Sequence, residues 1–200
     1  MLQIRLLGNF EAFLDGKPLP GLGPQLRRLL ALLTLEAGHP METGRLLHAI
    51  WPDSDTPDVA RKSLQRLRES LGTEADRLKV ESRMVCFEAR GAQIDVLEFQ
   101  ALVEQGDAEA LEQAVRLYRG SLLKEWEAEW ITTAREDLEI SYLDALKALA
   151  SHAMQVKNYL KAAYYLRRFV NGCPEMDWGW EALMEAYLGS YIPVKPQGQG

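Results

Sequence analysis

The stretch TPDVARKSLQRLRESLG, residues 56–72, carries the clearest helical signal in the chain. Its apolar residues recur at intervals of four and three, which places them on one face of a helix: Ala60, Leu64, Leu67 and Leu71. Thr56 is a favourable N-cap, Pro57 suits the first helical position, and Gly72 suits the end of the helix. The stretch therefore predicts an amphipathic helix over residues 57–72.

The polar face of this predicted helix is basic. Residues 60–72 contain four basic side chains, and Glu69 is the single acidic one. The candidate DNA-binding side chains on this face are Arg61, Lys62, Gln65, Arg66 and Arg68. Arginine and lysine bind phosphates or guanine edges, and glutamine pairs with adenine. An ordinary solvated helix face would have the same charges, so the position of the helix in the fold has to decide between the two interpretations.

The segments around this helix favour the DNA-binding interpretation. Short strands are predicted before it, with a tight turn at Asp15-Gly16 between the second and third: residues 2–6, 10–14 and 17–19. Two helices follow them, at 23–36 and 42–51, and a hairpin at 77–88 comes after the helix. This order is that of a winged helix preceded by a small sheet, in which the third helix reads DNA. Lys79 and Arg83 near the hairpin turn are further DNA-contact candidates, although Glu81 between them weakens that interpretation.

The second half of the chain has only helical patterns. Its predicted helices are 95–105, 107–119, 128–155, 158–171 and 176–189. We therefore predict a mainly α protein with small β elements: a winged helix-turn-helix domain at 1–93, and an all-α, tetratricopeptide-like module at 94–192. Residues 193–200 are rich in proline, glycine and glutamine, which predicts a flexible tail.

The two halves differ in charge. Residues 1–93 carry 13 basic and 12 acidic side chains, whereas residues 94–200 carry 10 and 17. The net charge of −6 therefore comes from the second half. Trp126 and Trp130 lie among glutamates there, which disfavours base stacking and favours a protein partner.

Several classes of function find no support in the sequence. The histidines are scattered, no glycine-rich phosphate loop occurs, and the two cysteines, Cys86 and Cys173, have no neighbours at metal-ligand spacing. We predict no enzyme activity, no cofactor and no metal site, and we expect both cysteines to be free thiols. The longest apolar run, Leu29 to Leu33, is far too short to cross a membrane, and the start of the chain lacks a signal-peptide pattern. We therefore expect a cytoplasmic protein.

Several of these segments resemble a known family. Four segments of the first half resemble the OmpR-type winged helix of SARP-type (Streptomyces antibiotic regulatory protein) transcriptional activators. They are LLGNF (residues 6–10), AIWPD (49–53), ARKSL (60–64) and LRESLG (67–72). The second half resembles the bacterial transcriptional activator domain of the same family, which is a tetratricopeptide-like module. The matching residues are Asp95, Phe99 and Leu102, followed by LYRG at 117–120.

The resemblance implies a double-stranded DNA site of direct repeats, binding as a homodimer or tandem pair, and contact with RNA polymerase or another protein through the helical domain. One departure concerns the third helix, which in the family commonly runs about four residues longer between its ARxSL and LRxxLG segments. Four residues amount to about one turn, or roughly 6 Å.

The predicted function is a DNA-binding transcriptional regulator. The alternative is an interaction scaffold that descends from such regulators and no longer binds DNA.

Overall fold

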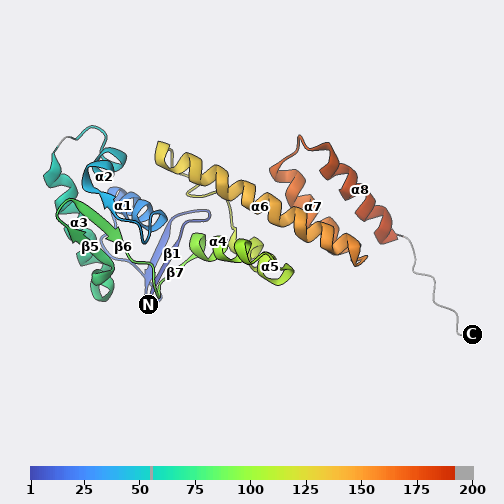
Figure 1. Cartoon of the computed structure of the whole chain (residues 1–200), viewed down its shortest axis with the longest axis horizontal. Helices are drawn as coiled ribbons and strands as arrows, with labels where there is room; N and C mark the ends of the chain where they lie inside the picture. The colour runs from blue at the N-terminus through green and yellow to red at the C-terminus, as the bar shows by residue number, and fades with distance from the viewer. Residues whose placement is uncertain (55, 192–200) are drawn as a thin grey trace, which may run out of the picture. The chain divides into compact units, whose positions relative to one another are not determined.

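The structure is a computed structural model that describes residues 1–54 and 56–191. Residue contacts divide the chain into two compact units, each described by itself below. Unit 1 comprises Met1–Glu98 and Arg119–Glu136, and unit 2 comprises Phe99–Tyr118 and the described residues from Asp137 onward. The predicted tail, residues 193–200, lies outside the described residues. Figure 1 shows the order of the elements along the chain.

Unit 1 begins with a four-stranded sheet in the order β3-β2-β1-β7. Strands β1 (Leu2–Arg5), β2 (Glu11–Leu14) and β3 (Lys17–Pro18) are antiparallel neighbours, as the sequence predicted. Asp15 and Gly16 both have positive φ, the conformation that a tight two-residue hairpin turn requires. The sequence analysis missed β7 (Gln93–Ile94), which pairs parallel to β1.

Three helices follow the first three strands, as expected: α1 (Pro24–Leu35), α2 (Thr43–Ile50) and α3 (Pro57–Leu71). Helix α3 has the predicted buried stripe of Ala60, Leu64, Leu67 and Leu71. Pro57 begins the helix and Gly72 ends it with positive φ. The predicted cap is wrong in one detail, because the Thr56 side chain makes no capping hydrogen bond.

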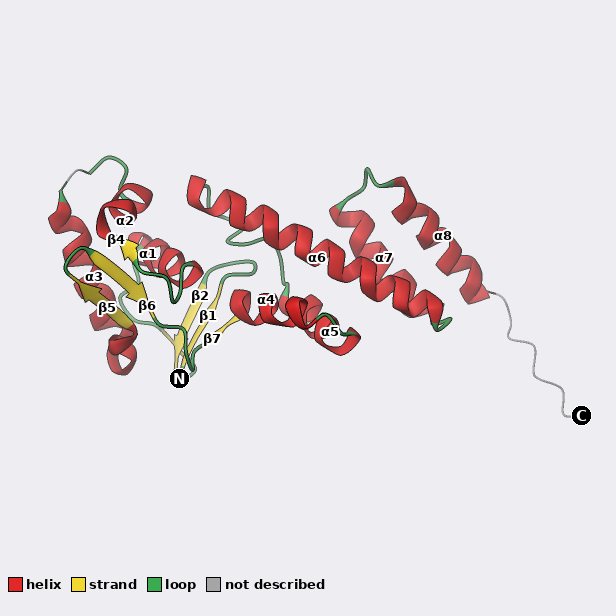
Figure 2. Ribbon diagram, in the orientation of Figure 1, coloured by secondary structure: helices red, strands yellow, loops and turns green. Residues whose placement is uncertain are grey.

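A second sheet forms the wing beside α3 (Figure 2). The hairpin strands β5 (Leu78–Glu81) and β6 (Met84–Phe87) turn at Ser82, which has positive φ. A short helix, η1 (Gly72–Arg77), connects α3 to β5. Strand β4 (Met41–Glu42), which the sequence analysis missed, pairs with β6 and gives the order β4-β6-β5. The winged helix-turn-helix fold is thus present in full.

The remaining helices agree with the predicted ranges to within a few residues: α4 (Asp95–Gln105), α5 (Ala108–Leu117), α6 (Glu129–Gln155), α7 (Tyr159–Gly172) and α8 (Asp177–Tyr191). Within the described residues after Ile94, the structure has no strand longer than the single bridge between Leu122 and Leu7. The core of unit 2 is built mainly from small and aliphatic side chains of α5, α6, α7 and α8, including Leu146, Leu166 and Leu183. The all-helical second half is therefore confirmed.

Segment 119–136, which we call the strap, lies on the sheet of unit 1 although its flanking segments belong to unit 2. Leu123 N–H donates to Leu6 O, Gly8 N–H donates to Ser121 O, and Phe10 stacks on Trp126 with ring centroids 5.5 Å apart. The two rings of the predicted partner face, Trp126 and Trp130, are half-buried. Phe10 of the same chain thus covers part of the Trp126 ring, and a protein partner for this face stays a prediction.

Candidate nucleic-acid interface

The five predicted side chains of α3 are all exposed, opposite the buried stripe. The stripe fixes the rotation of the helix, because leucines four and three residues apart must face the core together. Arg61, Gln65 and Arg68 therefore share one side of the helix, and Lys62 and Arg66 lie beside them. This is the arrangement that the sequence predicted.

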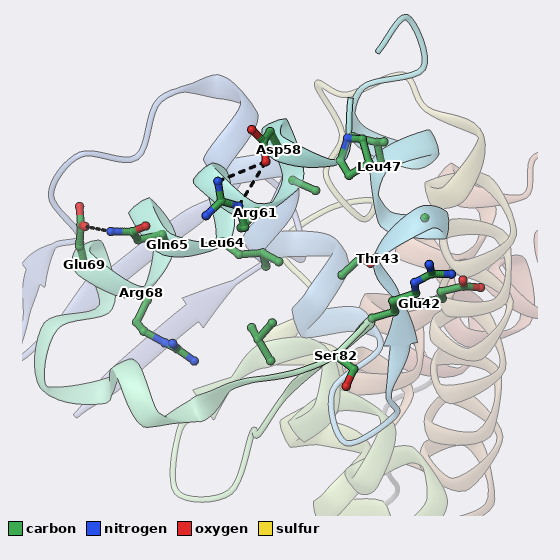
Figure 3. Close-up of a pocket in the computed structure, with 15 residues that line it drawn as sticks. Glu42, Thr43, Leu47, Asp58, Arg61, Leu64, Gln65, Arg68, Glu69 and Ser82 are labelled. Carbon is green, nitrogen blue, oxygen red and sulfur yellow. Dashed lines mark hydrogen bonds and ion pairs between the residues drawn. The ribbon is translucent and has the colours of Figure 1, made fainter. Parts of the chain in front are cut away.

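A groove of about 1040 Å³ lies between α3, the start of α2 and the wing. Four of the seven predicted DNA-binding residues line it: Arg61, Gln65, Arg68 and Arg83. Lys62, Arg66 and Lys79 do not line the groove, although all three are exposed. The structure thus brings the helix and the wing tip to one concave surface, and Figure 3 shows the side chains that line it.

The charge of this groove is balanced. Arg61, Arg68 and Arg83 face it together with Glu42, Asp58 and Glu69. From the sequence, only Glu69 and Glu81 were recognised as acidic side chains that oppose DNA binding. Glu42 and Asp58 add negative charge to the groove and were missed. An anionic ligand would therefore have to displace some of these carboxylates from their arginine and glutamine partners.

Two of the predicted side chains already have acidic or polar partners on α3. Arg61 Nε and Nη2 lie 3.3 and 3.2 Å from Asp58 Oδ1, and Gln65 Nε2 lies 3.2 Å from Glu69 Oε1. Both contacts are drawn in Figure 3. The Arg61 and Asp58 side chains are 72% and 58% exposed, and such surface pairs contribute only about 0–1 kcal/mol. A phosphate can therefore replace these partners at little cost.

Arg68 has a different kind of partner. Its Nη2 donates to Leu78 O at 2.6 Å, which ties the last turn of α3 to the first residue of the wing. A similar tie comes from Arg77, which the sequence analysis did not consider. Its guanidinium donates to Glu88 O and Arg90 O and pairs with Glu74. These two arginines hold the wing in place relative to α3.

The tip of the wing is bonded to the start of α2. Thr43 N–H donates to Arg83 O at 2.8 Å, while the Arg83 side chain remains exposed in the groove. Lys79 is exposed on β5.

Within the described residues, no group of three or more histidine, cysteine or carboxylate side chains is arranged to hold a metal ion.

The sheet beneath α1–α3 is joined to the strap through one buried carboxylate. Asp95, at the start of α4, accepts hydrogen bonds from Leu6 N–H at 2.8 Å and Leu7 N–H at 3.0 Å. Arg119 Nη2 lies 3.4 Å from the same carboxylate. Burial raises the pKa of Asp95, although the two N–H groups and Arg119 act in the opposite direction. Asp95 therefore connects three segments that are far apart in the sequence.

The comparisons with known proteins agree with this architecture. Residues 94–190 match the family model described as the bacterial transcriptional activator domain. These residues are therefore similar to that domain. The solved structure "Mycobacterium tuberculosis EmbR in complex with low affinity phosphopeptide" is similar in fold, with a TM-score of 0.80 and 21% sequence identity. The similarity covers 94% of this chain and 55% of that chain, so this chain spans about half the length of that structure.

A comparison with curated protein sequences found no match. The family match and the shared fold confirm the predicted resemblance to SARP-type transcriptional regulators, which are not a class of enzymes. In the described part of the chain, no helix is both long and apolar enough to span a membrane.

Proposed function

We propose that this SARP-type regulator binds promoter DNA in the cytoplasm, with α3 in the major groove and the wing on the adjacent backbone. One observation carries the proposal: α3 presents an exposed row of basic side chains beside a groove that the wing tip completes. Lys62 and Arg66 have the role of phosphate contacts, and Arg61 and Gln65 the role of base contacts. Arg68, Lys79 and Arg83 contribute at the edge of the interface.

The helical part has the role of contacting protein. Unit 2 carries excess negative charge and is built from stacked helices, which disfavours a second nucleic-acid surface. Contact with RNA polymerase and pairing of two chains on repeated half-sites belong to the same proposal.

The test is binding of the full chain to duplex DNA selected from a random pool. Replacing Arg61, Lys62 and Arg66 with alanine should weaken binding, and the slope of log affinity against log salt should fall by about 0.9 per lost phosphate contact. A residue that reads a base should instead relax the selected sequence, at about 1–3 kcal/mol for a bidentate contact.

The matched control replaces Arg116, Lys124 and Arg167, three exposed basic residues outside the groove and α3, with alanine. This variant loses the same charge and should keep both the affinity and the salt slope. Equal losses in the two variants would show that net charge, and not α3, governs binding.

The scaffold without DNA binding is the second candidate, and the balanced charge of the groove favours it. Under this alternative, Arg61 and Gln65 stay bonded to Asp58 and Glu69 and the groove binds no phosphate. The unmutated chain would then select no sequence from the DNA pool at low salt, where electrostatic binding is strongest.

A further inference from the structure

Helix α8 has an apolar stripe that remains in large part exposed among the described residues. Its inner face buries Gly179, Leu183 and Ala186 against the core of unit 2. The outer stripe consists of Trp180, Met184, Tyr187, Leu188 and Tyr191, whose exposed fractions are 45, 63, 41, 67 and 83%. At about 100° per residue, these five side chains span an arc of about 100° on one side of the helix. They therefore form one continuous strip and not scattered exposed residues.

Contacts hold the strip in place near both ends of α8. Trp180 Nε1 donates to Pro174 O at 2.9 Å, which fixes the indole ring while leaving it exposed. Gly189 lies so close to the Tyr159 ring that a Cβ there would stand 2.6 Å from it, so the last turn of α8 is held tightly against α7. Figure 2 shows α8 beside α7. A preformed aromatic surface of this kind loses little conformational entropy when a partner binds.

The charged side chains of α8 itself are all acidic, and Lys147 of α6 lies over the ring of Trp178, outside the strip. Glu175, Asp177, Glu181 and Glu185 are exposed, and residues 169–191 contain no lysine, arginine or histidine. The two glutamates of α8 lie directly next to the apolar arc. A ligand that covers the strip therefore meets negative charge along one edge.

We propose that the outer face of α8 is the docking surface for an amphipathic helix of a protein partner, whose apolar side chains cover the strip and whose lysine or arginine residues face Glu181 and Glu185. The inference deepens the protein-contact part of the proposed function, on which it rests, and it is independent of DNA binding. Charge complementarity selects the partner, because opposite potentials favour the encounter and like charges oppose it.

The same charges disfavour three other occupants. A second copy docked through this strip brings two rows of glutamates together, and DNA is repelled by them. Helices that lie on membranes carry lysine and arginine on their polar face, which α8 lacks. A basic helix that is apolar on one side is thus the class of partner that fits.

The experiment measures binding of two labelled 18-residue helical peptides to the full chain by fluorescence anisotropy. Both peptides carry leucines on one face, and the other face carries lysines in one peptide and glutamates in the other. The lysine peptide should bind at least tenfold more tightly than the glutamate peptide. Equal binding, or no binding of the lysine peptide, overturns the proposal.

Two variants with the same added charge locate the site. M184D places a carboxylate within the strip, and I140D places one on α6, where Ile140 is 58% exposed. M184D should weaken the lysine peptide at least tenfold in spite of the extra negative charge, whereas I140D should leave its affinity unchanged or raise it slightly. Retained affinity in M184D overturns the proposal.

Sedimentation and DNA binding complete the design. If the unmutated chain is a dimer that M184D converts to a monomer, the occupant is a second copy and the proposal is overturned. A monomer that binds the lysine peptide supports it. DNA binding of M184D should equal that of the unmutated chain. Retained peptide binding in M184D therefore counts against this inference alone, whereas an unmutated chain that binds no DNA counts against the DNA-binding part of the proposed function alone.

Discussion

Side-chain hydrogen bonds to backbone groups decide local stability at several positions of this chain. Asp107 accepts bonds from Glu109 N–H and Ala110 N–H at the start of α5, each at 3.0 Å. Asp95 does the same for Leu6 and Leu7 inside unit 1. In each case a carboxylate meets N–H groups that would otherwise have no partner, and an N–H group left unpaired in a buried site destabilises the fold.

Asp107 gives a prediction for the dependence of stability on pH. The Ala110 N–H, together with the Gln105 side chain, holds the pKa of Asp107 below its ordinary value of 3.8. A lowered pKa in the folded state means that the stabilisation is present above pH 3.8 and is lost as pH falls through the lowered pKa. D107A should therefore melt at a lower temperature than the unmutated chain at pH 6, and the difference should shrink as the pH falls toward 2.

The control is D107N, which keeps a capping oxygen but cannot titrate. Thermal denaturation followed by circular dichroism should show D107N close to the unmutated chain at pH 6 and less sensitive to acid. If D107A and D107N lose the same stability at pH 6, the capping bond is not what stabilises α5.

At the scale of elements, hydrogen bonds from two arginines connect the wing to α3 and η1. Arg68 links α3 to β5, Arg77 links η1 to the end of β6, and Thr43 links α2 to the wing turn. Arg68 and Thr43 line the groove, whereas Arg77 does not. The exposed basic residues without such ties, Lys62 and Arg66, are free to meet a ligand in our proposal.

The two kinds of arginine on α3 should separate stability from binding. R68A removes the bond to Leu78 O and should lower the free energy of unfolding by about 1.5–3 kcal/mol, the range for a hydrogen bond that involves a charged group. R66A removes an exposed side chain and should change it by at most about 0.5 kcal/mol. Urea denaturation measures both, and an equal loss in the two variants would contradict the structural role of Arg68.

For the whole molecule, the strap changes the division between the two halves. The sequence places a boundary between residues 93 and 94, and the family match begins at the same point. Yet β7, Asp95 and the strap contact the sheet of unit 1. The guanidinium of Arg135 donates to the carbonyls of three strap residues, Leu122, Leu123 and Trp126, and so holds the strap in its bent path.

Fragments that differ only beyond residue 98 test this coupling. A fragment of residues 1–98 lacks Leu122, Leu123 and Ile131, which are all fully buried in the chain. Each such side chain contributes about 1.5–3 kcal/mol, and the total stability of a domain is only about 5–15 kcal/mol. The fragment should therefore melt at least about 10 °C below a fragment of residues 1–136.

Equal melting temperatures for the two fragments, measured by calorimetry, would show that the strap is not part of the first folding unit.

The complementary fragment 94–192 keeps the core of unit 2 and should remain helical by circular dichroism. Its strap leucines would be exposed to solvent, so we expect it to be less soluble than the full chain.

The sequence by itself determined the helices, the wing hairpin and the exposed basic face of α3, because hydrophobic period, turn residues and helix-ending glycines act over a few neighbouring residues. It did not determine β4 or β7, which are too short to carry a pattern, nor the acidic lining of the groove and the carbonyl partner of Arg68. Only the tertiary structure decided these features. It also decided the position of the strap and the hydrogen bond from Leu6 N–H to Asp95, which lies 89 residues away in the sequence. Contacts between residues so far apart depend on how the whole chain packs, and no local pattern encodes them.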